Sequence, residues 1–202
     1  LHDALPILVI LISGSGSNMV ALAQAAQQRH WQARFGAHIR CVISNRPDAA
    51  GLAKARDLGL HTEVLDHRSF KDHPQPREAF DAALAELVQS HQPRWVLLAG
   101  FMRVLTPVFL DRFEHSVMNI HPSLLPAFPG LNTHERALAA GCRFAGASVH
   151  WVNSELDAGH IIDQVVVPIS PGDDAQSLAA RVLTQEHVLY PRAVERVLSG
   201  QS

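Results

Sequence analysis

The chain has 202 residues, which predicts a single domain over residues 1–202. Hydrophobic residues make up 47% and charged residues 18%, so the chain can bury a core and is not disordered. Lysine and arginine number 17 against 19 acidic residues, and the net charge of -2 argues against nucleic acid or an anionic membrane as a partner. Cys41 and Cys142 form no C-x-x-C motif, so we expect no disulfide, no thiolate metal site and a cytoplasmic location.

Apolar, partly β-branched runs predict strands at residues 7–12, 39–44, 61–65, 95–99 and 117–120. The first run is too short to span a membrane and lacks the basic start of a signal peptide. Helical spacing between the runs predicts helices at 19–29, 49–58 and 77–90. Apolar strands that alternate with helices indicate an α/β fold, whose mostly parallel sheet carries helices on both faces. Beyond residue 130 the pattern predicts a short helix, two added strands and a closing helix, at 133–140, 145–152, 161–169 and 174–198.

A Ser-Gly-Ser-Gly-Ser-Asn loop at residues 13–18 joins the first strand to the first helix. Free backbone N–H groups and the positive end of a helix dipole suit a phosphate there. The loop is not a dinucleotide fingerprint, because Met19 replaces the third glycine and Ser-Asn-Arg at 44–46 replaces the acidic residue that binds a ribose. Two interpretations remain: a tight turn in which Ser17 or Asn18 caps the helix, or a monophosphate site at the amides of Gly16, Ser17 and Asn18.

Asn119 and His121 come at the end of the fifth predicted strand. Alternation along a strand puts both side chains on one face, at the edge of the sheet where α/β proteins bind ligands. An amide that donates to a developing oxyanion and an imidazole that moves protons are the groups that acyl transfer needs. The alternative is a hydrogen-bonded pair at a strand end with no chemical role.

Several ordered motifs resemble those of one family, the phosphoribosylglycinamide formyltransferases, which are folate-dependent enzymes of purine synthesis. The resemblance spans about residues 7–198 and is most specific in Asn-Ile-His-Pro-Ser-Leu-Leu-Pro at 119–126 and Phe-Pro-Gly-Leu-Asn-Thr-His at 128–134. Further matches are Ile-Ser-Gly-Ser-Gly-Ser-Asn at 12–18, Leu-Ala-Gly-Phe-Met-Arg at 98–103, Ser-Val-His at 148–150, Glu-Leu-Asp-Ala-Gly at 155–159 and Gln-Glu-His at 185–187. It implies a Rossmann-like formyltransferase fold with an antiparallel strand region in the C-terminal half. The half at 7–120 would bind the nucleotide phosphate, and the half at 121–199 would bind folate and carry the catalytic residues.

The resemblance implies transfer of a formyl group from the co-substrate 10-formyltetrahydrofolate to the amine of N1-(5-phospho-D-ribosyl)glycinamide, without a metal or a covalent intermediate. Asn119 and His121 match the catalytic amide and imidazole, and Asp157 matches the carboxylate that raises the pKa of the histidine. Ser148 and His150 match positions on the strand beside the site, and Ser148 is expected among the catalytic residues. From the residues alone, Asp157 is an ordinary turn residue and His150 a hydrogen-bonded core histidine.

Glu186 interrupts an apolar stripe on the last helix and is therefore expected to be buried. One interpretation from the residues alone is an ion pair with a nearby arginine such as Arg181 or Arg192. The resemblance instead implies that Glu186 binds the ribose or glycinamide part of the ribonucleotide, whose phosphate lies at Gly16, Ser17 and Asn18. Leu183 stands at a position where some members of the family carry a polar residue, which puts substrate contacts at this position in doubt.

A folate site is implied at two loops and one arginine that meets the glutamate tail. Its expected residues are Arg77, Met102, Arg103, Val104, Leu105, Asn119, His150, Asn153, Ser154, Glu155, Leu156 and Asp157. Loop backbone groups can bind the ring edges while apolar side chains cover its faces. Without the resemblance, Arg77 and Arg103 are predicted to be solvated surface charges.

The competing interpretations are a formyltetrahydrofolate hydrolase, a methionyl-tRNA formyltransferase and a non-catalytic sugar-phosphate binding module. The length argues against the first two, and the charge also argues against tRNA. A metal hydrolase is disfavoured because the 13 histidines show no H-x-x-x-H spacing. Most of them are expected at the surface, including His30, His38, His67, His73 and His91. We further expect small-molecule substrates only, a monomer or weak homodimer, a C-terminus shorter than is usual in the family and an N-terminal segment, residues 1–5, that is foreign to the natural protein.

Overall fold

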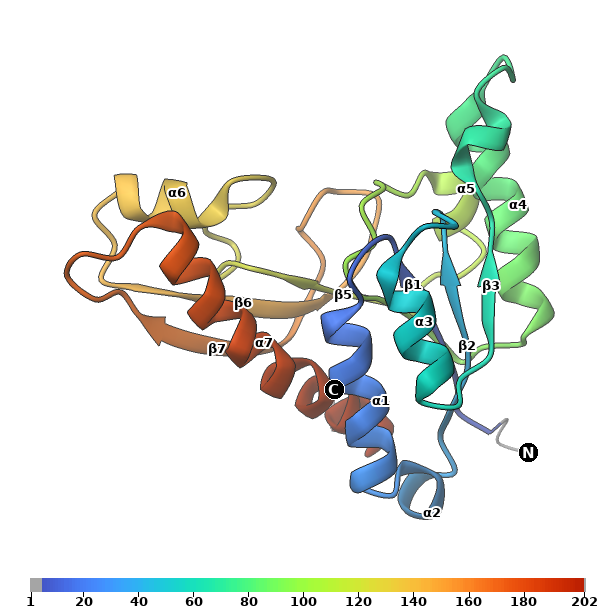
Figure 1. Cartoon of the computed structure of the whole chain (residues 1–202), viewed down its shortest axis with the longest axis horizontal. Coiled ribbons are helices and arrows are strands. Elements are labelled where there is room, and N and C mark those ends of the chain that lie inside the picture. Colours follow the sequence, from blue (N-terminus) through green and yellow to red (C-terminus); the bar gives the residue numbers. More distant parts are fainter. Residues whose placement is uncertain (1–4, 202) are drawn as a thin grey trace. The chain divides into compact units, whose positions relative to one another are not determined.

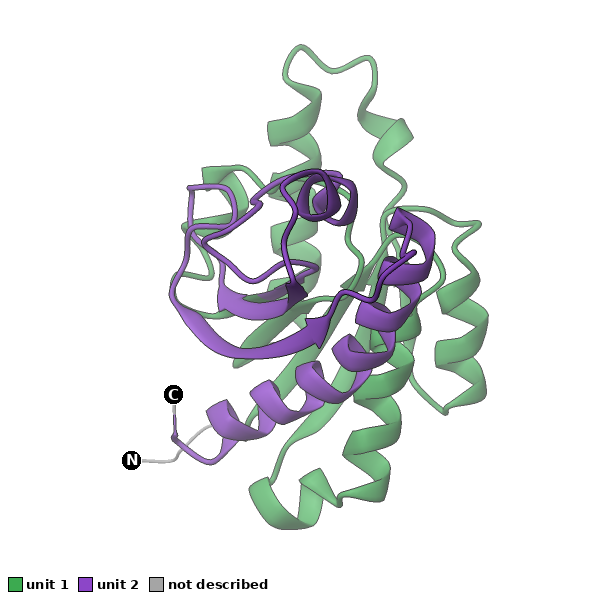
Figure 2. Cartoon of the chain, turned by 90° about the vertical axis from the view of Figure 1, so that its left-hand side faces the viewer, with its two compact units in different colours: residues 1–118 green, residues 119–202 purple. Residues whose placement is uncertain are grey.

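The computed structural model describes residues 5–201, which form two compact units, Leu1–Met118 and Asn119–Ser202 (Figure 2). The seven strands follow the order β3-β2-β1-β4-β5-β6-β7 in one sheet. The expectation about residues 1–5 falls largely on residues 1–4, which lie outside the described part of the chain. Within that part, no helix has the length and apolar character needed to cross a membrane.

The first unit is built on a parallel sheet in which β1 pairs with both β2 and β4, and β2 pairs with β3 (Figure 1). Its strands are β1 (Ile7–Ile12), β2 (His38–Ser44), β3 (Thr62–Val64) and β4 (Trp95–Leu98). Its helices are α1 (Ser17–Gln28), α2 (Trp31–Phe35), α3 (Ala50–Asp57), the 3-10 helix η1 (His67–Phe70), α4 (Pro76–Ser90) and α5 (Pro107–Leu110). Residues 8–12 of β1 are completely buried, which explains the uninterrupted apolar run in its sequence.

Strand β5 (Val117–His121) begins in the first unit and ends in the second. The second unit continues with α6 (Thr133–Ala139), β6 (Phe144–Trp151), β7 (Ile161–Pro168) and α7 (Ala175–Leu198). Strands β6 and β7 are antiparallel, and α7 packs on both. A capping box starts α7, because the Asp174 carboxylate accepts from the backbone N–H of Ser177 and the Ser177 hydroxyl accepts from the backbone N–H of Asp174.

The predicted α/β class, with a mostly parallel sheet and added antiparallel strands, is confirmed. Every predicted strand and helix is present, with ends that differ by at most two residues from those predicted. Helices α2, η1 and α5 were not predicted, because segments of four or five residues are too short to show a helical period. The surface assignment is confirmed for His30 and His73, whereas His38 and His67 are half-buried and the His91 side chain, bonded to Glu63, is only 13% exposed.

Candidate functional site

The glycine loop leaves the start of α1 without a side-chain cap in the described structure. Gly16 is the N-cap residue and has a φ of 72°, so neither Ser17 nor Asn18 caps the helix and that interpretation is wrong. A Cβ at Gly16 would lie 2.9 Å from the Cα of Gly51, which shows how closely the loop packs against α3. The start of α1 therefore presents the favourable end of the helix dipole to an anion, and none of the described side chains caps it.

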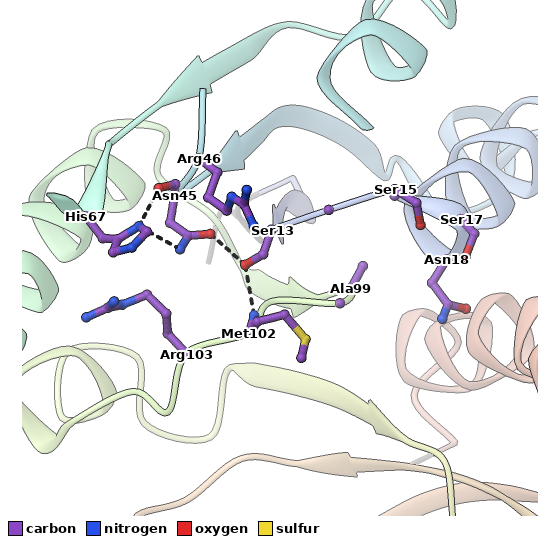
Figure 3. A pocket seen from close by; sticks show the side chains of 13 residues that line it. Ser13, Ser15, Ser17, Asn18, Asn45, Arg46, His67, Ala99, Met102 and Arg103 are labelled. Atoms are coloured by element: carbon purple, nitrogen blue, oxygen red, sulfur yellow. Dashed lines mark hydrogen bonds between the residues drawn. The ribbon is translucent and has the colours of Figure 1, made fainter. Parts of the chain in front are cut away.

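A cavity of about 470 Å³ opens over this loop (Figure 3). Arg46, His67 and Arg103 contribute to its wall, and none of the carboxylates at residues 5–201 lines it, although Arg46 pairs with Asp48 at 2.9 Å. Two predicted sets of residues meet here, namely Gly16, Ser17 and Asn18 from the ribonucleotide set and Met102 and Arg103 from the folate set. Basic side chains and a helix N-terminus give the cavity a positive character, which suits a phosphorylated ligand.

A hydrogen-bonded network that the sequence did not predict supports the cavity wall. Ser13 Oγ donates to Asn45 Oδ1 at 2.6 Å and accepts from the backbone N–H of Met102 at 2.8 Å (Figure 3). His67 Nδ1 lies 2.9 Å from the backbone carbonyl oxygen of Asn45 and 3.3 Å from its side-chain Nδ2 (Figure 3). Polar residues directly after β1 and β2 were the only available signal for this network, because parallel strands end at the same edge of a sheet.

The loop at residues 102–106 is held by Asp81, a buried carboxylate on α4. Asp81 Oδ2 accepts from the backbone N–H of Thr106 at 2.6 Å and from its hydroxyl at 2.7 Å. Burial raises the pKa of Asp81, although both bonds from Thr106 oppose this. Sequence patterns do not distinguish Asp81 from a surface acid on an amphipathic helix.

Met102 and Val104 are exposed at the tip of this loop, whereas Leu105 is only 7% exposed. Arg77 is exposed and donates to the backbone carbonyl of Val104 at 3.4 Å, so the predicted solvated position is only partly right. Arg103 is half-buried and its guanidinium lies 4.5 Å from the Phe80 ring centre, so it is not the predicted free surface charge. Arg77 and Arg103 together line a second cavity of about 450 Å³.

In the second unit, His121 and Asp157 form a buried ion pair at the end of β5. His121 Nδ1 lies 3.4 Å from Asp157 Oδ2, and both side chains are 8% exposed. His121 Nε2 donates to the backbone carbonyl of Phe128 at 2.9 Å. Each ring nitrogen of His121 thus faces an oxygen atom that can accept a hydrogen bond. Asp157 has a φ of 51° and its Oδ2 also accepts from the backbone N–H of Gly130 at 2.9 Å, which fixes the carboxylate.

His150 and Asn119 complete this cluster. His150 Nε2 lies 3.7 Å from Asp157 Oδ1, and Nδ1 lies 3.0 Å from the backbone carbonyl of Trp151. Burial lowers the pKa of His150 despite the nearby Asp157, so the neutral imidazole is favoured. Asn119 is half-buried, and its side chain makes no hydrogen bond to the residues at 5–201. Its amide is therefore available to a ligand.

Ser148 differs from the prediction of a direct catalytic role. Its side chain is completely buried, and its hydroxyl donates to the Ser123 carbonyl at 2.7 Å. The same hydroxyl accepts from the backbone N–H of Leu125 at 3.0 Å and from Gln164 Nε2 at 2.9 Å. These three bonds tie Ser148 to the proline-rich loop that follows His121 and to Gln164 on β7.

The predicted folate segment at residues 153–156 is an exposed loop between β6 and β7, formed by Asn153, Ser154, Glu155 and Leu156. Asn153 Oδ1 accepts from the backbone N–H of Glu155 at 2.9 Å and shapes the turn. A Cβ at Gly159 would lie 1.6 Å from the Trp151 carbonyl oxygen, so only glycine fits where the loop returns to β6. Leu156 is 59% exposed and can cover an apolar ligand face.

Glu186 is 7% exposed on the buried face of α7, as predicted. The alternative of an ion pair with Arg181 or Arg192 is wrong, because these arginines bind Asp173 at 2.7 Å and Asp163 at 2.6 Å instead. Leu183 lies one turn earlier and is 38% exposed. A buried carboxylate on this face is typical of a group that binds a polar ligand or a buried donor.

The chain matches the formyl transferase family over residues 7–194. It belongs to that family. The phosphoribosylglycinamide formyltransferase of Escherichia coli (strain K12) is 42% identical over 194 residues, which cover 96% of this chain and 88% of the relative. The resemblance found in the sequence is thereby confirmed.

Solved structures of the formyl transferase family share this fold. The glycinamide ribonucleotide transformylase 1 of Symbiobacterium toebii is 40% identical with a TM-score of 0.89, over 97% of this chain and 89% of that one. The phosphoribosylglycinamide formyltransferase of Brucella melitensis is 44% identical with a TM-score of 0.87, over 98% of both chains. At these identities the likeness extends beyond the fold to the family itself.

Proposed function

We propose that the chain is a phosphoribosylglycinamide formyltransferase, which moves the formyl group of 10-formyltetrahydrofolate onto the amine of N1-(5-phospho-D-ribosyl)glycinamide. The observation that carries the proposal is the buried His121–Asp157 pair beside the free amide of Asn119, in a chain that matches relatives of this name over almost its whole length. The reaction belongs to purine biosynthesis, the pathway in the printed names of other relatives.

The cavity over the glycine loop is the proposed phosphate site. Backbone N–H groups of Gly16, Ser17 and Asn18 face the phosphate at the start of α1, and Arg46 adds positive charge to the wall. Glu186 is proposed to accept hydrogen bonds from the ribose or glycinamide part. Met102, Val104 and Leu156 offer exposed apolar surface to the folate ring, and Arg77 offers a charge to its glutamate tail.

The chemistry is proposed to proceed by direct attack of the substrate amine on the formyl carbon. A carbon–nitrogen bond forms, and the formyl oxygen becomes an oxyanion that accepts hydrogen bonds from Asn119 and His121. Asp157 supplies the negative charge that balances the imidazolium, and Gly130 keeps that carboxylate in place. The bond to N10 of the folate then breaks, and the proton lost by the amine passes to N10.

For His121 to reach the oxyanion, Nε2 exchanges the Phe128 carbonyl for the substrate oxygen. The contact with Asp157 stays in place through this exchange, so the charge balance of the pair is kept. We also propose that the chain works in the cytoplasm on small-molecule substrates, as a monomer or a weak homodimer. Its free cysteines, Cys41 and Cys142, support a reducing compartment.

The proposal is tested by measuring whether consumption of the formyl donor requires the acceptor amine. We expect 10-formyltetrahydrofolate to be consumed only when phosphoribosylglycinamide is present, and His121→Ala or Asp157→Ala to lower turnover by at least about a hundredfold. Arg143→Ala, at an exposed position in the same unit, is a control that should keep wild-type turnover. Equal consumption of 10-formyltetrahydrofolate without the acceptor would show that the chain is a hydrolase and not a transferase. Tight binding of the ribonucleotide with no turnover would indicate a binding module.

A further inference from the structure

Four potential metal ligands gather on the outer part of the first sheet, away from the residues that line the glycine-loop cavity. Cys41 Sγ, a carboxylate oxygen of Glu63 and a ring nitrogen of His91 all lie within 4.8 Å of one another. His61 joins them, since its Nε2 lies 3.2 Å from Glu63 Oε1. None of these residues takes part in the proposed transfer.

The fold explains why residues so far apart in sequence meet. Strands β2 and β3 are parallel, with Val42 paired to Thr62 and Ile43 to Glu63. Because side chains alternate along a strand, His61 and Glu63 share one face of the sheet edge with Cys41. Helix α4 ends beside this face, and His91 at its C-cap reaches Glu63 Oε2 with a nitrogen at 3.0 Å.

The cluster is enclosed enough to hold its groups in place. Cys41 is completely buried, and the side chains of His91 and Glu63 are 13% and 29% exposed. The His61 side chain is 61% exposed, so one side of the cluster opens to solvent. An ion can therefore enter from that side, and His61 can rotate to close over it.

The chemistry of the four groups is that of a zinc site. Thiolate sulfur, imidazole nitrogen and carboxylate oxygen are the ligands that zinc takes, usually four in a tetrahedron. Among residues 5–201, the Cys41 thiol has only a weak hydrogen bond, to the Val42 carbonyl at 3.7 Å. Burial and the charge of Glu63 raise the pKa of Cys41 to about 12, so without a cation the thiol is neutral beside the carboxylate.

We propose that Cys41, His61, Glu63 and His91 bind a divalent transition-metal ion of the zinc class. Metal–sulfur, metal–nitrogen and metal–oxygen bonds form, the thiol proton leaves to solvent, and no group is oxidised or reduced. Bond lengths of about 2.0–2.3 Å require the ligand atoms to close by roughly an ångström, which side-chain rotation can supply. The bound ion would tie β2, β3 and the end of α4 together and stabilise the first unit.

Cobalt(II) titration of the full chain tests this site, because cobalt replaces zinc and reports its ligands by absorption. We expect a thiolate-to-cobalt charge-transfer band and the visible bands of a tetrahedral ion, both abolished by added zinc. Cys41→Ser should remove the charge-transfer band, whereas Cys142→Ser, a matched control at the other cysteine, should keep it. His61→Gln and His91→Gln should each weaken cobalt binding more than about tenfold, and His115→Gln, at a histidine side chain 89% exposed, should not.

Zinc should also raise the thermal unfolding midpoint of the wild type and of Cys142→Ser, and raise that of His91→Gln by less. This second readout decides the matter if Cys41→Ser does not fold. Absence of the charge-transfer band in the folded wild type would overturn the proposal. Persistence of the band in folded Cys41→Ser, or an equal zinc shift in His91→Gln, would do so as well. The cobalt absorption bands and the zinc-dependent unfolding midpoint do not depend on formyl transfer, so failure of the metal site and failure of the proposed function can be told apart.

Discussion

Replacement of Ser148 by alanine separates a supporting role from a catalytic one. In Ser148→Ala the Leu125 N–H and the Ser123 carbonyl lose their partner in a fully buried place, while Gln164 keeps its second bond, to the Leu125 carbonyl at 2.9 Å. An unsatisfied buried polar group costs about 1–3 kcal/mol, so we expect a loss of about 3 kcal/mol in the free energy of unfolding. For a chain of this size that loss lowers the unfolding midpoint by about 6–12 °C.

Calorimetry on the wild type and Ser148→Ala measures this shift directly. Ser199→Ala is the matched control, because its exposed hydroxyl also bonds a carbonyl, that of Arg196, yet its removal should change stability by less than about 0.5 kcal/mol. An unchanged midpoint in Ser148→Ala together with lost turnover would refute the supporting role and restore the direct catalytic one.

Three further outcomes follow from the geometry. In urea unfolding, Gly16→Ala should lower the free energy of unfolding more than Gly59→Ala. Both glycines have a positive φ, but only at Gly16 would a Cβ contact neighbouring atoms. Equal losses of free energy in the two variants would contradict the close packing of the glycine loop. Asn18→Ala and Glu186→Ala should weaken ribonucleotide binding more than folate binding in calorimetric titrations, and equal effects on both ligands would disprove this assignment. Stability should fall as pH drops below about 6.5, because burial lowers the pKa of three histidines and the unfolded chain binds protons before the folded one does. These histidines are His134, His150 and His187. A thermal unfolding midpoint that is the same at about pH 7.5 and at about pH 5.5 would contradict this expected loss of stability.

The strands were predictable because burial on both faces leaves a direct mark in the sequence. Residues 8–12 form an unbroken apolar run for the same reason that they are fully buried. Helices of four or five residues leave no such mark, so α2 and α5 became known only from the structure. Their positions depend on tertiary packing and not on any local period.

The candidate site was predictable where its residues share one element. Asn119 and His121 stand two apart on β5, so strand alternation alone puts them together. Asp157 was reached only through the family resemblance, because its position beside His121 depends on a left-handed backbone turn in a distant loop. A motif match at Ser148 does not reveal that its hydroxyl already makes three hydrogen bonds.

Sequence patterns did not predict the clusters whose residues come from several different elements. Ser13, Asn45 and His67 form one wall network from three segments, and nothing in their spacing predicts it. Cys41, Glu63 and His91 come likewise from two strands and a helix end, so no short sequence spacing predicts that they meet. Long-range pairing in a parallel sheet is what creates both clusters.

The fate of an isotopically labelled formyl carbon tests the central claim most directly. Wild-type protein is incubated with labelled 10-formyltetrahydrofolate and phosphoribosylglycinamide. The products are then separated, and mass spectrometry identifies which of them carries the label. We expect the label on the glycinamide nitrogen, with little free formate, and we expect Asp157→Ala to form this product at least about a hundredfold more slowly. Label recovered as free formate, or an unchanged rate in Asp157→Ala, would contradict the proposed transfer.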